Sequence, residues 1–233
     1  MLLAADVLRL VSGALQDLEP GMEARWPWEA DEGRVGLLDF LNAALRAVAL
    51  QRPDCCAVTE VIRLEPGMRQ QIPGKRHGAS SEATGFCGLI RNMGCDGEHP
   101  GPAIVSAQPD VLMVWADMAR PACMVENFAY DRAVNGQVYY VCPPVPEDAD
   151  VYVEATYYAA PKKIVSPDES LGIADDYAQA LVHHMLASVL SGDNESSNAA
   201  KASYHIQLFN AQIGAKTQVD AMLPKAKNSV GGA

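Results

Sequence analysis

The stretch RVGLLDFLNAALRAVALQ, residues 34–51, is the part of the chain that decides the fold most directly. Its large apolar side chains recur at intervals of three and four residues, which places them on one stripe of an α-helix. The members of this stripe are Leu38, Leu41, Leu45 and Val48. A proline at position 53 has no N–H with which to continue helical hydrogen bonding, so the helix is expected to stop before it. The stretch therefore predicts an amphipathic helix that buries one face.

Three other stretches show the same helical period. One lies near the start, over residues 3–18, and two lie toward the end, over residues 174–191 and 195–217. Gly192 separates the last two, and Asp193 is a suitable N-cap for the second of them. Their apolar positions are Leu3, Val7, Val11, Leu15 and Leu18, then Ala178, Leu181, Val182, Met185 and Val189, then Ala202, Ile206, Phe209 and Ile213.

A different pattern fills the middle of the chain, from Cys56 to about Pro161. Short runs of β-branched and aromatic residues alternate there with turn residues, and Asn135-Gly136 is a signal for a β-hairpin. Pro143-Pro144 is a turn signal that is expected to end one of these strands, and residues 109–115 are expected to form a short helical turn. The expected strands cover residues 57–64, 68–72, 86–91, 124–130, 137–141 and 150–158.

These patterns predict an α+β fold. Two N-terminal helices (residues 1–53) and two C-terminal helices (166–217) form a helical bundle. Between them lies a central antiparallel β-insertion (54–165), resembling a sandwich or barrel. Residues 218–233 contain Pro224, Gly231 and Gly232 and show no period, so they are expected to form a flexible tail.

Composition and charge narrow the possible functions. Apolar residues make up 49% of the 233 residues and charged residues 20%, as in an ordinary folded protein. The net charge of −11 argues against binding nucleic acid through phosphate contacts, which require clustered Lys and Arg. From Val141 to Ala200, ten acidic residues stand against Lys162 and Lys163, so this stretch alone carries −8. We therefore expect it to form a strongly negative surface.

No segment is long and apolar enough to be expected to span a membrane. The apolar start is interrupted by Asp6 and Arg9 before the core of a signal peptide could form. A cytosolic origin is therefore expected, in which the six cysteines stay reduced.

Cysteine and histidine patterns give little support to a catalytic or metal site. No Cys-x-x-Cys pair occurs, and the adjacent Cys55 and Cys56 are expected at the start of a strand, pointing to opposite faces. His183 and His184 are neighbours on a helix and diverge too far to chelate one ion, although His205 on the next helix could approach one of them. We expect no metal and no cofactor.

Two other arrangements deserve comparison with known catalytic motifs. Residues 73–76, Pro-Gly-Lys-Arg, resemble the end of a phosphate-binding loop but lack its first glycine and its Ser or Thr, so a turn is expected. A triad of Cys87, His99 and Asp110 can be assembled on paper, as in many β-rich chains that contain several cysteines. No active site is predicted.

Residues 37–54, from the second helix into Arg-Pro-Asp, resemble the opening of the head-to-tail adaptor (connector) family of short-tailed, podovirus-type bacteriophages. Later pieces follow in a similar order, and together they cover about residues 35–215. These pieces are Gly67 with Gln70-Gln71-Ile72-Pro73, Leu89 to Gly94, Pro109 to Trp115, Phe128 to Asp131, Val138 to Pro144, Asp176 to Ser191 and Ala199 to Gly214.

This resemblance implies a non-enzymatic virion protein in the neck of the particle, assembled in the host cytoplasm. The subunits would form a ring, expected to be twelvefold, that docks on the portal protein, extends the DNA channel and receives the tail nozzle or tube. DNA would pass through the channel without specific binding. The β-insertion would face outward or toward the next tail component.

The resemblance also suggests where such contacts lie. In the family the C-terminal extension reaches into the portal, so Met222 and Leu223 would supply an apolar anchor there, and Lys225 and Lys227 would meet acidic portal surface. Trp26 and Trp28 either cover their own helical core or, together with Tyr204, contact a neighbouring subunit.

Three alternatives remain open from the sequence. The chain could be another tail-tube or head-completion subunit, which would form rings or tubes without recognising a portal. It could be a thiol- or metal-dependent enzyme, or a β-module that binds carbohydrate or a receptor. The last would need exposed aromatic platforms, and aromatic residues make up only 6% of the chain.

Overall fold

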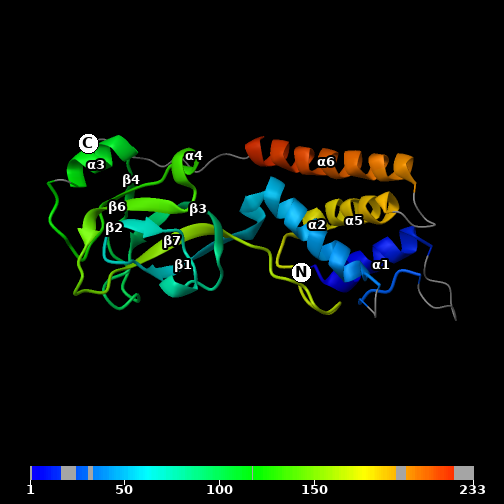
Figure 1. Cartoon of the computed structure of the whole chain (residues 1–233), viewed down its shortest axis with the longest axis horizontal. Coiled ribbons are helices and arrows are strands. Elements are labelled where there is room, and N and C mark those ends of the chain that lie inside the picture. Colours follow the sequence, from blue (N-terminus) through cyan, green and yellow to red (C-terminus); the bar gives the residue numbers. More distant parts are fainter. Residues whose placement is uncertain (1, 17–24, 31–33, 117, 193–197, 223–233) are drawn as a thin grey trace. The chain divides into compact units, whose positions relative to one another are not determined.

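The computed structural model describes residues 2–16, 25–30, 34–116, 118–192 and 198–222, which form six α-helices, three short 3-10 helices and two β-sheets. The mixed helix-and-sheet class predicted from the sequence is confirmed. The chain divides into two compact units (Figure 1). One consists of Met1–Cys55 together with Pro161–Ala233, and the other of Cys56–Ala160.

The first unit, called here the helical unit, contains α1 (Ala4–Ala14), α2 (Leu37–Gln51), α5 (Ala178–Ser191) and α6 (Ala199–Met222). Helix α5 packs against each of the other three, and Figure 1 shows α6 running alongside it. The four helices share one core that contains most of the apolar positions predicted from the sequence, although Leu3 and Ile206 are exposed and Leu18 lies outside the described residues. Its large members include Val7, Leu8, Val11, Leu37, Leu41, Leu45, Val48, Leu181, Met185, Val189, Phe209 and Ile213.

Several helix ends differ from the predicted ones. Helix α2 starts at Leu37 because Gly36 is its N-cap, and the Gly36 N–H donates to Asp39 Oδ2 at 3.3 Å. Helix α5 starts at Ala178, preceded by the 3-10 turn η3 (Asp175–Tyr177). Helix α6 continues to Met222, beyond the end expected at residue 217. The sequence pattern missed this extension because residues after 217 add no apolar side chain at helical spacing.

The second unit, called here the β unit, contains both sheets. One sheet has the order β1 (Ala57–Arg63), β7 (Tyr152–Ala159), β3 (Ala83–Asn92), and all of its pairings are antiparallel. The other has the order β2 (Gly67–Gln71), β6 (Val138–Val145), β5 (Asn127–Ala129), β4 (Val105–Ser106). Strand β4 was not predicted, and it pairs with β5 in parallel, so this second sheet is mixed rather than purely antiparallel.

Side chains from both sheets form one core, with Phe86 at its centre. The Phe86 ring stacks on Tyr139 with ring centroids 4.3 Å apart and meets Phe128 and Tyr130 edge to face. Glycine is required at position 88, since a Cβ atom there would lie 2.9 Å from Phe128 Cζ. The aromatic cluster and the course of β3 therefore depend on one another.

Three local expectations for the β unit were wrong. Asn135-Gly136 does not form a two-residue hairpin turn, because Asn135 ends the short helix α4 (Arg132–Asn135) and Gly136 has a helical φ of −69°. Pro143 and Pro144 lie within β6, opposite an irregularity in the register of β2, where prolines without N–H groups are tolerated. Cys55 and Cys56 end the 3-10 turn η1 (Pro53–Cys56) and do not start a strand.

The helical unit is held together by a buried asparagine on α2. The Asn42 carboxamide donates from Nδ2 to the carbonyl of Ile164 and accepts at Oδ1 from the Ile164 N–H, both at 2.8 Å. The same Nδ2 donates to the Leu38 carbonyl. Asn42 thereby fixes the backbone of a segment 122 residues later in the chain, where it returns from the β unit.

A second link joins the end of α2 to α6. The Arg52 guanidinium forms a bidentate ion pair with Asp54, with N–O distances of 2.9 and 2.7 Å, and donates to Thr217 Oγ1 at 3.2 Å. The hydrogen bond from Arg52 is the main reason why the pKa of Asp54 is lowered. This link fixes the far part of α6 against the N-terminal half of the unit.

Replacing Asn42 with alanine should destabilise the helical unit, because the buried N–H and C=O groups of Ile164 would lose their partners. Each unsatisfied group costs roughly 1–3 kcal/mol. Urea unfolding followed by helical circular dichroism would measure the loss. The matched control is Asn210→Ala on the exposed surface of α6, which should change the free energy of unfolding by about 0.5 kcal/mol or less. Equal effects of the two substitutions would contradict the role given to Asn42.

Candidate interaction surfaces

Helix α3 (Pro109–Ala116) presents an unusually apolar surface on the β unit. It packs on β5 and β6, and its Leu112 is fully buried in a small cluster with Ala129 and Cys142. The residues on either side of Leu112 point away from this cluster and are exposed. The exposed apolar side chains, together called the α3 patch, are Val111, Met113, Val114, Trp115 and Met118.

The patch stands out against the rest of the chain. Eight of the sixteen large apolar side chains that are exposed in the described residues lie between positions 105 and 134. Val114 is 62% and Met118 77% exposed. Val111, Val114 and Trp115 recur at the spacing of a single helix face, and Met118 follows two residues after the end of α3. Exposed apolar surface containing Trp and Met is typical of protein–protein contacts.

A groove of about 370 Å³ adjoins the patch. Met113 lines it from α3, Val134 from α4, and Val138 and Tyr140 from β6. Asp110 and Asp131 also line it, and among the described residues its lining contains no basic side chain. The groove is therefore suited to an apolar side chain carried by a segment with basic neighbours.

Sequence reasoning missed this surface. Residues 111–115 form an unbroken apolar run, which indicates burial on all sides and hides the fact that α3 covers the sheet with only one face. Burial of Leu112 alone satisfies the packing of the helix. The sequence did contain one signal of this surface, because the segment has more apolar residues than so short a helix can bury.

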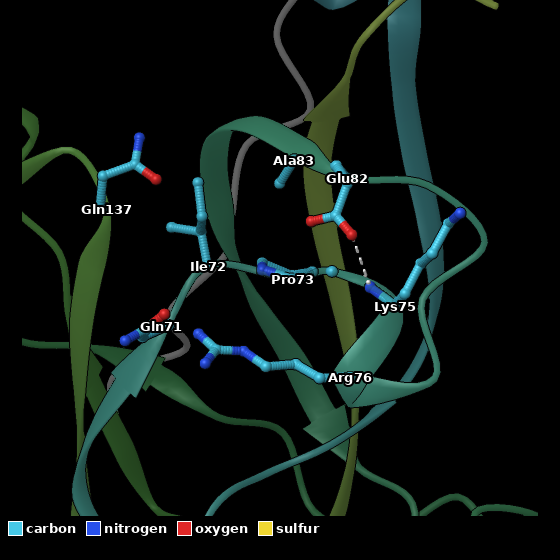
Figure 2. A pocket seen from close by; sticks show the side chains of 9 residues that line it. Gln71, Ile72, Pro73, Lys75, Arg76, Glu82, Ala83 and Gln137 are labelled. Atoms are coloured by element: carbon cyan, nitrogen blue, oxygen red, sulfur yellow. Dashed lines mark hydrogen bonds between the residues drawn. The ribbon is translucent and has the colours of Figure 1, made fainter.

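A pocket of about 410 Å³ in the β unit is lined in part by the turn η2 (Lys75–His77) and is shown in Figure 2. Its lining includes Lys75, Arg76 and Glu82. The Lys75 N–H donates to Glu82 Oε1 at 3.2 Å, so this N–H is already paired with a carboxylate of the chain. The turn expected at residues 73–76 is present as η2, which covers Lys75–His77.

Desolvation raises the pKa of the Cys87 thiol and of the Cys142 thiol. A raised pKa disfavours the thiolate that a nucleophile needs. His99 pairs with Asp96 at 2.6 Å. Among the described residues, no group of three or more His, Cys, Asp or Glu side chains is arranged to hold a metal ion.

The acidic stretch is partly neutralised. Asp150 pairs with Arg63, Glu154 with Arg91 at 2.6 Å, Glu169 with Lys162 at 2.9 Å and Asp176 with Lys216 at 2.7 Å. Three of these four cations come from outside residues 141–200, and the stretch is divided between the two units. The expectation of one strongly negative surface did not take these cations into account.

The residues predicted at subunit contacts lie on different elements. Trp26 and Trp28 pack partly buried against the helical core, Trp26 edge-on to Phe40 and Trp28 donating from Nε1 to Ser12 Oγ at 2.9 Å. Tyr204 on α6 is 56% exposed. Each tryptophan thus covers its own core, and a contact with a neighbouring subunit stays a prediction for all three.

The predicted portal-docking residues follow α6. Met222 is the last residue of this helix, and Leu223, Lys225 and Lys227 lie outside the described residues. No helix in the described part of the chain combines the length and apolar character needed to cross a membrane.

Comparison with known proteins assigns the chain to a family. The model of the SU10 adaptor protein family matches residues 3–229, nearly the whole sequence. The chain belongs to the SU10 adaptor protein family, consistent with the phage head-to-tail adaptors that the sequence resembles. A search of curated proteins found no match.

Substitutions on α3, and at Met118 just beyond its end, should distinguish the exposed side chains of the α3 patch from the packed Leu112. Val114→Ser and Met118→Ser should each change the free energy of unfolding by about 0.5 kcal/mol or less, because both side chains already face solvent. Leu112→Ala, the matched core control, should cost about 2–5 kcal/mol. Denaturant unfolding measures all three, and a loss at Val114 or Met118 as large as that at Leu112 would show that the patch is packed.

Proposed function

We propose that this chain is the subunit of a head-to-tail adaptor ring of a short-tailed phage, a structural and non-enzymatic component of the virion neck. The ring, expected to contain twelve copies, docks on the portal protein, extends the DNA channel and provides the attachment site for the tail nozzle or tube. The family match over residues 3–229 is the observation that carries this proposal.

Each unit has a part in the proposal. The helices α1, α2, α5 and α6 form the bundle that builds the ring wall, and Trp26, Trp28 and Tyr204 contribute to contacts between neighbours. The α3 patch and its groove, on the β unit, receive the next tail component. Apolar surface beside Asp110 and Asp131 supports this assignment, since it suits an apolar anchor with basic neighbours.

The C-terminal segment makes the contact with the portal. Met222 and Leu223 act as an apolar anchor, and Lys225 and Lys227 meet acidic portal surface. A short peptide that becomes ordered on binding suits a joint that must form only after the head is filled. The net charge of −11 supports a channel that lets DNA slide through without specific binding.

Deleting residues 223–233 should abolish binding to portal particles and leave the fold intact. The truncation starts after Met222 so that α6 is kept whole. Sedimentation with purified portal measures binding, and circular dichroism measures helix content and melting temperature, both of which should be unchanged. A truncated protein that binds portal as well as the full chain would refute the docking role.

A charge variant tests the two lysines separately. Lys225→Ala with Lys227→Ala should weaken portal binding and make the remaining binding less sensitive to salt, since two charge contacts are lost. The matched control is Lys162→Ala with Lys163→Ala, a pair of adjacent exposed lysines elsewhere in the chain. Equal weakening by both pairs would indicate a general effect of net charge.

A further inference from the structure

Three of the chain's five histidines lie in the contact between α5 and α6. His183 Nδ1 on α5 is 3.0 Å from His205 Nδ1 on α6, and the two rings are stacked with centroids 5.2 Å apart. His184, next on α5, meets Phe209 of α6 edge to face at 5.1 Å. Its Nδ1 is buried without a hydrogen-bond partner among the described residues. The three are called here the histidine seam.

The His183–His205 contact can hold one proton between its facing nitrogens. One Nδ1 carries a hydrogen and donates it, and the other accepts with its lone pair, so the accepting ring carries its own proton on Nε2. A first added proton binds the free Nε2 of the donating ring and leaves the hydrogen bond in place. A second must bind the accepting Nδ1, which leaves two N–H groups and two positive rings facing each other.

The other two histidines each lie near a carboxylate: His77 is 3.6 Å from Glu65, and His99 pairs with Asp96 at 2.6 Å. Burial lowers the pKa of His77 as well, while Glu65 raises it. In the histidine seam, burial is the first cause that lowers the pKa of each of the three histidines. His205 lowers the pKa of His183 further, and Lys201 lowers that of His205. Among the described residues, no carboxylate contributes to these shifts, although the chain has 29 acidic residues.

These directions determine how the contact depends on pH. A free histidine has a pKa of about 6.5. Each histidine of the packed state has a lower pKa, so a lower pH is needed to protonate it. The packed state is therefore fully favoured above about pH 6.5. As the pH falls below about 6.5, the packed state loses stability. This loss ends once the pH is below the lowered pKa values of the packed histidines. Asp54, whose pKa is lowered from 3.8, acts only at much lower pH.

We propose that the His183–His205 pair is a proton-operated latch between α5 and α6. It holds α6 in place while the facing nitrogens share one proton, and it releases α6 when both nitrogens are protonated. Helix α6 is suited to release because its described side chains bury few large apolar groups, chiefly Phe209 and Ile213. The latch rests on the α5–α6 geometry and does not depend on the proposed adaptor role.

Hydrogen exchange of the full-length protein tests the latch directly. After correction for intrinsic exchange rates, amides of α6 should lose protection between about pH 7.5 and about pH 5.5. For each proton taken up on release, the ratio of open to closed α6 should rise by up to about tenfold per pH unit. His183→Gln with His205→Gln, which keeps hydrogen-bonding groups but does not titrate, should reduce this pH dependence and leave only the part that the buried His184 contributes.

The control variant is His99→Gln, which removes a histidine of the β unit and should leave the pH dependence of α6 unchanged. NMR titration of the histidine rings in the unaltered protein provides a test that no substitution can disturb. His183 and His205 should titrate in a coupled manner below the ordinary histidine pKa, in step with the loss of α6 protection. Two results would overturn the proposal. One is that α6 stays protected when both rings are fully protonated, and the other is that the double variant shows an unchanged pH dependence.

Discussion

The helical unit depends on the pairing of Asn42 with the backbone of Ile164. The chain leaves this unit after Cys55, forms the whole β unit, and returns at Pro161, so its helical core can close only if the returning segment is placed correctly. A buried carboxamide that matches both the N–H and the C=O of one residue fixes that segment in position and direction. The β unit uses the same arrangement: Asn92 donates to the Val125 carbonyl and accepts from its N–H. Each unit is thus closed by hydrogen bonds that a hydrophobic core alone would not specify.

The sequence predicted the helices better than the sheets, because the helical period of apolar residues can be recognised within one segment of the chain. Four helical stripes were each long enough to be recognised, and each of the four helices contributes part of its stripe to the core. Strand pairing depends on residues far apart in the chain, so the parallel β4–β5 pair could not be read from its two-residue strand. Pro143 and Pro144 were expected to end a strand, yet β6 continues through them because its partner strand is irregular there.

The functional surfaces were predictable only in part. The approach of His205 to the histidines of α5 follows from helix spacing, and the structure places it against His183. The α3 patch was hidden because exposure depends on which face of a short helix meets the sheet, and local sequence does not encode that choice. The neutralisation of the acidic stretch was missed for a similar reason, since Arg63, Arg91 and Lys216 lie far from it in the sequence.

We propose that this chain, a member of the SU10 adaptor protein family, forms a ring on a portal. Electron microscopy of the purified full-length protein, alone and mixed with its portal, tests this proposal. We expect monomers or small oligomers in the protein alone and a closed ring of density, added to one end of the portal, in the mixture. Two results would contradict the proposal. One is the growth of tubes without portal, and the other is that portal particles gain no density at a large excess of the chain.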